Sequence, residues 1–194
     1  TLTKTVSTVS GICPDAVDAM VLTVTPTPDA ANAGADIDQC NNSIFTMAAN
    51  TPANGTGTWS VVGPDPGITI TNVNSATTTV TGLTAGNSVT LRWTISNGSC
   101  ADETDDVVLT NDVQPSSNAG ADDETCSDQA TYTVSGSTSA NGTIVWTSSS
   151  GGTFADNSVE NPIYNINATD ITNGTVTLTK TVSTVSGICP DAVD

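Results

Sequence analysis

The chain has 194 residues, of which 20 are acidic, 3 are basic and none is histidine, giving a formal net charge of −17. Nucleic acids and anionic lipid surfaces are bound by clustered basic residues, and this chain has only Lys4, Arg92 and Lys180, so we expect neither nucleic acid binding nor membrane insertion. Without histidine the chain lacks an ordinary general base near neutral pH, a histidine-activated nucleophile and an imidazole ligand for zinc, so we predict that it is not an enzyme.

Threonine is unusually abundant along the chain. Its β-branched side chain suits a pleated, partly solvated surface. Frequent glycine, proline and Asn-Gly pairs mark turns between short strands. We therefore expect an all-β protein with almost no helix.

The chain opens with TLTKTVSTVSGICPDAVD, residues 1–18, and the same letters recur without change as residues 177–194. An identity of this length indicates a repeat. The residues from Ala19 onward are then what would follow Asp194. We expect the sequence to be one period plus an overlap, taken from a longer tandem array.

Residues 1–29 are predicted to be the last two strands and the linker of a preceding module, with its final strand at Ala19–Thr25. An isolated two-stranded ribbon is marginal in water, and a sandwich without its last strand exposes an edge. Either the polypeptide continues into further repeats, or the ribbon of one molecule adds to the sheet of another. We favour continuation, because the duplicated segment holds a whole strand and its turn, which strand addition would not require.

A second, divergent repeat lies within the period. NAGADIDQC at 32–40 matches NAGADDETC at 118–126, GTGTWS at 55–60 matches GTIVWT at 142–147, and VTLRWTISNGSC at 89–100 matches VTLTKTVSTVSGIC at 176–189. The spacing is close to the ~100 residues of an immunoglobulin-type sandwich. We predict tandem immunoglobulin-like β-sandwich modules in an array or filament: a complete one at residues 30–115, and one at residues 116–194 whose final strand comes from the next repeat.

The pattern places short strands in both modules. In the first module they are Ala33–Gln39, Ser43–Ala48, Thr56–Val61, Ile68–Thr71, Ala76–Val80, Ser88–Ser96 and Asp106–Thr110, and in the second Ala130–Val134, Thr143–Thr147, Pro162–Asn167 and Thr175–Val185. Within Ser88–Ser96, apolar residues alternate with polar ones, as in a strand with one face on a core. Trp59 and Trp146 occupy the strand where such a sandwich places its central aromatic residue.

These residues also carry a resemblance to a family. The runs NAGADIDQC, TGTWSVV, TTTVTGLTAGNSVTLRWTISNGSC and ADETDDVVLT resemble the PKD-like, immunoglobulin-like repeats of very large secreted surface proteins of Bacteroidota, including gliding-motility adhesins. The Trp-Asp-Phe-Gly-Asp-Gly signature of PKD domains proper is absent, with Trp59-Ser60-Val61 in its place. The resemblance implies a secreted, cell-surface or extracellular fibre that adheres or spans distance, with no catalytic residues.

The five cysteines fall into two positional classes. Cys40 and Cys126 follow the first strand of each module, whereas Cys13, Cys100 and Cys189 follow the sixth. Since Cys13 and Cys189 are one position seen twice, each period holds an even number of cysteines, as is typical of disulfides in a secreted β-rich chain. Free buried thiols are the alternative.

Pairing within modules would join Cys40 to Cys100 and Cys126 to Cys189. In immunoglobulin strand order these turns lie at opposite poles, roughly 20 Å apart, whereas a disulfide needs Cα atoms within about 7 Å. We therefore predict pairing between modules: Cys40 with Cys189, Cys126 with Cys100 of the following copy, and Cys13 and Cys100 with preceding modules. A different strand order would restore the pairing within modules.

Carboxylates gather beside the predicted joints. Calcium binds six to eight oxygen ligands and would stiffen a joint, so it is the cofactor that such clusters would take. The candidate ligands are Asp36, Asp38, Asp102, Asp105, Asp106 and Asp122. We favour solvated acidic turns that keep a secreted polymer soluble and expect no cofactor, with a calcium site as the alternative.

Lysine occurs once per period, as Lys180 and its copy Lys4. A crosslink from Lys180 to an asparagine is one interpretation, but the matching region of the first module holds Arg92 and Trp93. We expect instead an exposed lysine that protects a sheet edge.

The function predicted from the sequence is a non-catalytic repeat of a long extracellular fibre or adhesin stalk, whose partners are further copies of itself. The alternative is a binding module that recognises surface glycans, other cells or a protein. A sugar-binding face needs exposed aromatic side chains. The chain has seven aromatic residues, of which Trp59 and Trp146 are expected in cores, and this favours a spacer.

Overall fold

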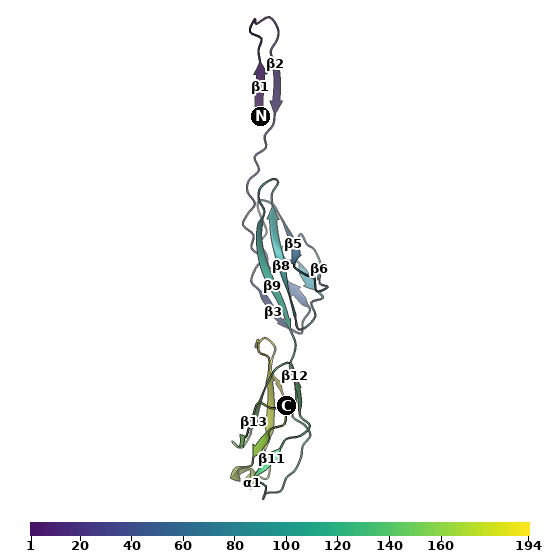
Figure 1. The fold of residues 1–194 in the computed structure, drawn as a ribbon, viewed down its shortest axis with the longest axis vertical. Coiled ribbons are helices and arrows are strands. Elements are labelled where there is room, and N and C mark those ends of the chain that lie inside the picture. The colour runs from purple at the N-terminus through teal and green to yellow at the C-terminus, as the bar shows by residue number, and fades with distance from the viewer.

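The computed structural model describes residues 1–194, and Figure 1 shows an elongated molecule with three units along its long axis. We call residues 1–29 the hairpin segment, residues 30–115 module 1 and residues 116–194 module 2. About 40% of the residues are in strands and 3% in helix. No helix has the length and apolar character that a membrane span requires.

The hairpin segment contains β1 (Leu2–Val6) and β2 (Ala16–Met20), which pair antiparallel. Every residue of both strands is exposed. The sequence-based strand at Ala19–Thr25 is wrong in position. The last pair joins Met20 to Leu2, where β1 begins, so the residues after Met20 have no neighbouring strand to bond with.

Module 1 is a sandwich of two sheets (Figure 1). The larger has the order β3 (Ile37–Cys40), β9 (Glu103–Asp112), β8 (Asn87–Ser96), β5 (Thr56–Val62), and the smaller has the order β4 (Ile44–Thr46), β7 (Thr79–Thr81), β6 (Thr69–Ile70). All neighbours are antiparallel except β3 and β9, which are parallel.

The inner faces of these sheets enclose a core of 13 buried apolar residues. Its centre is the pair Trp59 and Trp93, which lie opposite each other on β5 and β8 with ring centroids 5.0 Å apart. Tilted aromatic pairs of this kind contribute about 0.5–1.5 kcal/mol beyond the area that they bury. The alternation in β8 is the one expected, with its apolar side chains buried.

The first strand of module 1 is shorter than expected. It begins at Ile37 rather than Ala33, because the residues before it bond to side chains instead of to a strand. The N–H of Ala33 donates to Asp105, and the N–H of Gly34 donates to Asn32, with Gly34 at φ +92. This backbone angle favours glycine, so the turn is fixed by the sequence.

Module 2 repeats the arrangement with smaller sheets. One has the order β13 (Thr143–Ser148), β16 (Leu178–Ser183), β17 (Ala192–Val193); another has the order β11 (Thr131–Thr133), β15 (Ile163–Asn165), β14 (Thr153–Phe154); and β10 (Ser116–Asn118) pairs with β12 (Thr138–Ala140). The final strand, expected to be missing, is begun by β17. The ladder reaches Asp194, whose backbone exchanges hydrogen bonds of 2.7 and 3.0 Å with Lys180.

The short helix α1 (Ala168–Asn173) was not expected from the sequence. The Asn167 side chain accepts hydrogen bonds from the N–H groups of Thr169 and Asp170, and Asp170 accepts from the N–H of Asn167. The helix ends at Gly174, at φ +73. This reciprocal capping is the signal in the sequence that could have revealed it.

The hairpin segment has the pairing of the last two strands of module 2. Thr5 pairs with Val17 and Val6 with Ala16 in the hairpin, and the copies of these residues pair in the same way in β16 and β17. Val182 is fully buried in module 2, whereas its copy Val6 is 57% exposed. The hairpin therefore presents a face that module 2 buries.

Candidate functional site: the joint between modules

A disulfide joins the end of module 1 to module 2. Cys40, at the end of β3, bonds to Cys189, in the turn between β16 and β17, with their Cα atoms 4.9 Å apart. This is the pairing expected between modules. The alternative of Cys40 with Cys100 and Cys126 with Cys189 is not found, because Cys13, Cys100 and Cys126 are free. Cys189 is buried.

Hydrogen bonds surround this disulfide. Gln114, in the linker, donates from Nε2 to the carbonyl of Pro190 at 3.0 Å, and Asn141 donates from Nδ2 to the carbonyl of Gln114 at 3.2 Å. The Ser186 hydroxyl donates to Asp112 at the end of β9. The joint is therefore a covalent link together with several polar contacts, which restrict bending between the modules.

The joint between the hairpin segment and module 1 has related contacts without a disulfide. Cys100, in the turn between β8 and β9, is half-buried, with Sγ 3.6 Å from the Thr25 carbonyl oxygen and 3.5 Å from that of Pro26. Asn97 donates from Nδ2 to the Pro26 carbonyl at 2.9 Å. The turn between the last two strands, β8–β9 in module 1 and β16–β17 in module 2, thus meets the incoming linker in both modules.

The candidate calcium ligands are not brought together. The structure has no group of three or more acidic, histidine or cysteine side chains that could hold a metal ion. Three of the expected ligands instead hold the fold: Asp36 accepts from the N–H of Val108, Asp105 from that of Ala33, and Asp106 pairs with Arg92. The Arg92 hydrogen bond lowers the pKa of Asp106. Asp38, Asp102 and Asp122 do not join them.

Lys180 is fully buried in module 2, which corrects the expectation of an exposed edge lysine. Its ammonium donates to the Ser137 hydroxyl at 3.0 Å and pairs with the Glu160 carboxylate. It also lies 5.7 Å from the centroid of the Trp146 ring, within the range of a cation–π contact. Lys180 faces Trp146 across the sheet, as Trp93 faces Trp59 in module 1.

Glu160 is the partner that makes this burial tolerable, since a buried charge without a counter-charge is strongly destabilising. The hydrogen bond from Lys180, together with that from Ser139, lowers the pKa of Glu160 and keeps it ionised. This cluster was not predicted from the sequence. A signal for the burial of Lys180 was present, because Lys180 alternates in phase with Leu178 and Val182 and so lies on the inner face of its strand.

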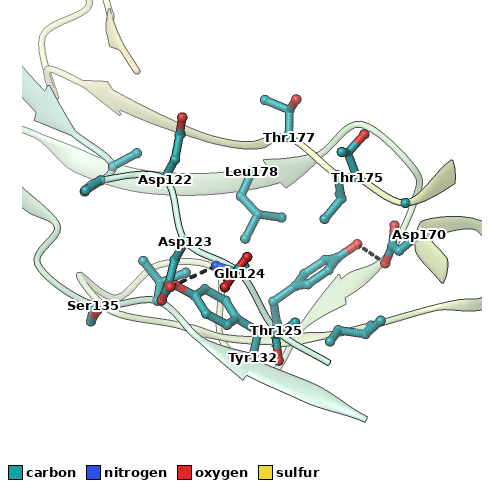
Figure 2. A pocket seen from close by; sticks show the side chains of 18 of the residues that line it. Asp122, Asp123, Glu124, Thr125, Tyr132, Ser135, Asp170, Thr175, Thr177 and Leu178 are labelled. Atoms are coloured by element: carbon teal, nitrogen blue, oxygen red, sulfur yellow. Dashed lines mark hydrogen bonds between the residues drawn. The ribbon is translucent and has the colours of Figure 1, made fainter. Parts of the chain in front are cut away.

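A cavity of about 630 Å³ opens in module 2 beside β16. Its lining includes residues of the irregular segment 119–127 together with Val176, Thr177 and Leu178. Figure 2 shows the Leu178 side chain pointing into this space, with Tyr132 and Asp123 on another side. The N–H of Glu124, followed by the Tyr132 hydroxyl at 2.9 Å, lowers the pKa of Asp123.

No family model and no curated protein matches the chain. Among solved structures it is similar to extracellular domains 3–5 of Drosophila OTK, with 11% identity and a TM-score of 0.57, covering 93% of this chain and 65% of that one. It is also similar to the insect immune protein hemolin, with 12% identity and a TM-score of 0.43, covering 97% and 53%. The chain spans less than two thirds of either structure. It is a nearly all-β protein with an immunoglobulin-like fold.

Proposed function

We propose that this chain is a non-catalytic repeat unit of a long extracellular fibre or cell-surface adhesin stalk, whose modules join end to end. The observation that carries the proposal is the repeated hairpin. Residues 1–18 have the sequence of residues 177–194 and the same strand pairing. A hairpin that exposes apolar residues buried in its copy is part of a module whose other strands precede it.

The joint supports a mechanical role. The disulfide between Cys40 and Cys189 transmits tension through a covalent bond as well as through the linker. Linkers with proline, such as residues 113–115 between β9 and β10, are semi-rigid spacers. A bond of this kind forms in an oxidising compartment, which fits secretion to the cell surface.

The distribution of aromatic side chains favours a spacer over a glycan-binding module. The buried aromatic residues are Phe45, Trp59, Trp93, Trp146 and Tyr164, and Tyr132 and Phe154 are half-buried. No aromatic side chain is therefore fully exposed as a platform for sugar rings. The partners that we propose are further copies of the same repeat.

One structural neighbour fits this proposal. The OTK structure is described as extracellular domains. A surface stalk built from PKD-like repeats, as in the adhesins of Bacteroidota, is our proposed setting. The net charge of −17 would keep such a polymer soluble.

The size of the protein isolated from its source tests the proposal. Mass spectrometry or a denaturing gel under reducing conditions should show a polypeptide many periods long. A polypeptide of 19.5 kDa, the mass of this chain alone, would contradict it.

A further inference from the structure

We propose that the cavity of module 2 is a groove that accepts a β-strand, and that its occupant is the segment Ala19–Thr25 of a second copy of this repeat. This inference rests on the proposed function, because a protein built of repeats provides the second copy. The contacts that define the groove lie within this chain.

Module 1 shows what fills the equivalent space. There β9 runs on to Asp112, between β8 and β3, and its side chains Val107 and Leu109 are 1% and 0% exposed. They lie opposite Leu91 and Val89 of β8. In module 2 the corresponding strand β17 ends at Val193, and the segment equivalent to β3 forms no strand.

The walls of the groove are incompletely covered in module 2. Leu178 and Val176 occupy the places that Leu91 and Val89 have in module 1, because Lys180 and Trp93 are equivalent. Leu91 is buried, whereas Leu178 and Val176 are half-buried. The cavity of module 2 therefore has an apolar wall that no strand covers. In module 1, strand β9 covers the equivalent wall.

A hydrogen bond that occurs in both modules shows which residues of their last strands are equivalent. The Asp105 carboxylate accepts from the N–H of Ala33 at 2.8 Å, and Asp194 accepts from the N–H of Ala119 at 2.9 Å. Asp105 lies opposite Trp93, as Asp194 lies opposite Lys180. Asp105 and Asp194 are thus the same position of the fold.

The register names the residues that would enter the groove. Asp18 is the copy of Asp194, so the residues after it follow in the repeat. Met20 then takes the place of Val107, and Leu22 takes the place of Leu109. Met20, Leu22 and Val24 alternate with smaller or polar residues, and they are 57%, 61% and 85% exposed in this structure.

The edge of the groove offers a matching acceptor. In module 1 the Asp36 carboxylate accepts from the N–H of Val108 at 2.8 Å. Asp122 is the equivalent of Asp36 in the aligned runs, and Val21 is the equivalent of Val108. We expect the N–H of Val21 to donate to Asp122. The donor segment carries no charge between Ala19 and Pro28, so the acidic wall does not repel it.

Hydrogen exchange on a chain with Ala19–Pro28 appended after Asp194 tests the groove. Amide exchange at residues 122–126 and 176–178 should slow by ~10-fold or more, because new strand pairing protects these amides. The matched control carries aspartate at the two appended positions that correspond to Leu22 and Val24, and it should exchange like the original chain. Equal exchange in all three chains would overturn the inference.

A synthetic peptide of Ala19–Pro28 added to the original chain is the second measurement. Protection by the free peptide supports the groove and shows that a separate copy can fill it. Protection by the appended segment alone also supports the groove and places the donor in the same polypeptide. Because protection does not depend on native length, a native protein of a single period would reject the fibre while leaving the groove intact.

Discussion

Lys4 and Lys180 show how the fold, rather than the local sequence, decides what a residue does. Both lie in the sequence TLTKTVS, and both lie in the first strand of a β-hairpin. Lys180 is fully buried against Trp146 with Glu160 as its partner, whereas Lys4 is exposed. The difference arises because other strands of module 2 pack around the hairpin that contains Lys180, whereas β1 pairs only with β2.

Replacement of Lys180 by alanine tests this role at the residue scale. Loss of the buried stem and of the ion pair should destabilise module 2 by about 2–4 kcal/mol. In urea unfolding followed by tryptophan fluorescence, the transition reported by Trp146 should move to lower urea. Lys4→Ala is the control in the same local sequence and should change stability by less than about 0.5 kcal/mol. Equal effects of the two substitutions would contradict the burial of Lys180.

Glu160 gives module 2 a pH dependence. Its pKa is lowered in the folded state, first by the Lys180 hydrogen bond and then by that from Ser139. The unfolded chain therefore binds more protons in acid, so this contribution is complete above the unfolded pKa of about 4.3 and is lost as the pH falls through the folded pKa. Melting temperatures of the Glu160→Gln variant should fall less between pH 5 and pH 2 than those of the original protein. If the melting temperatures of the two proteins fell equally between pH 5 and pH 2, Glu160 would not contribute to the pH dependence of stability.

At the element scale, the turn between the last two strands is the part of each module that contacts its neighbour. In module 2 this turn carries Cys189 and Pro190, which contact Cys40 and Gln114. The closed loop is long, with a sequence separation of 149 residues. The joint is thus held by groups from both modules.

Replacement of Cys189 by serine should loosen this joint. For a loop closed over 149 residues the chain-entropy model gives a loss of about 5 kcal/mol in stability, and the angle between the modules should vary more. Small-angle X-ray scattering should show a broader distribution of interatomic distances than for the original protein. Cys100→Ser, which removes a free thiol, should leave the distribution unchanged. An unchanged distribution for Cys189→Ser would mean that the polar contacts alone hold the joint.

The sequence predicted the strands that carry strong alternation. Ser88–Ser96 appears as β8, and Thr56–Val61 appears as β5, with Trp59 in the core. These strands are central, so burial on one face leaves a clear period of two. The strand predicted at Ala19–Thr25 differs from β2, which ends at Met20, the partner of Leu2 at the start of β1.

The site was predictable only in part. The Cys40–Cys189 pairing followed from strand direction and pole positions, which are properties of the fold. The inward-facing position of Lys180 was predictable from the alternation in its strand, but its partner Glu160, 20 residues earlier, was not, because no periodic pattern connects the two. Three of the six acidic residues predicted as calcium ligands, Asp36, Asp105 and Asp106, bond to backbone N–H groups and Arg92, and only the folded structure brings these partners near.

At the scale of the whole molecule, we propose a polymer in which each module is completed by the residues that follow it. Figure 1 shows the hairpin segment, module 1 and module 2 in one line, so further repeats would extend the same axis. Cys40 bonds to the turn of the following module, and Cys126 holds the equivalent position at the end of module 2.

Disulfide mapping of a chain continued by one further period after Asp194 tests whether every module is joined to the next by a disulfide. After proteolysis without reduction, mass spectrometry should recover the Cys126 peptide bonded to the peptide of the second copy of Cys100, beside the Cys40–Cys189 pair. Cys126 recovered as a free thiol, or bonded to Cys189 within its own module, would contradict the account.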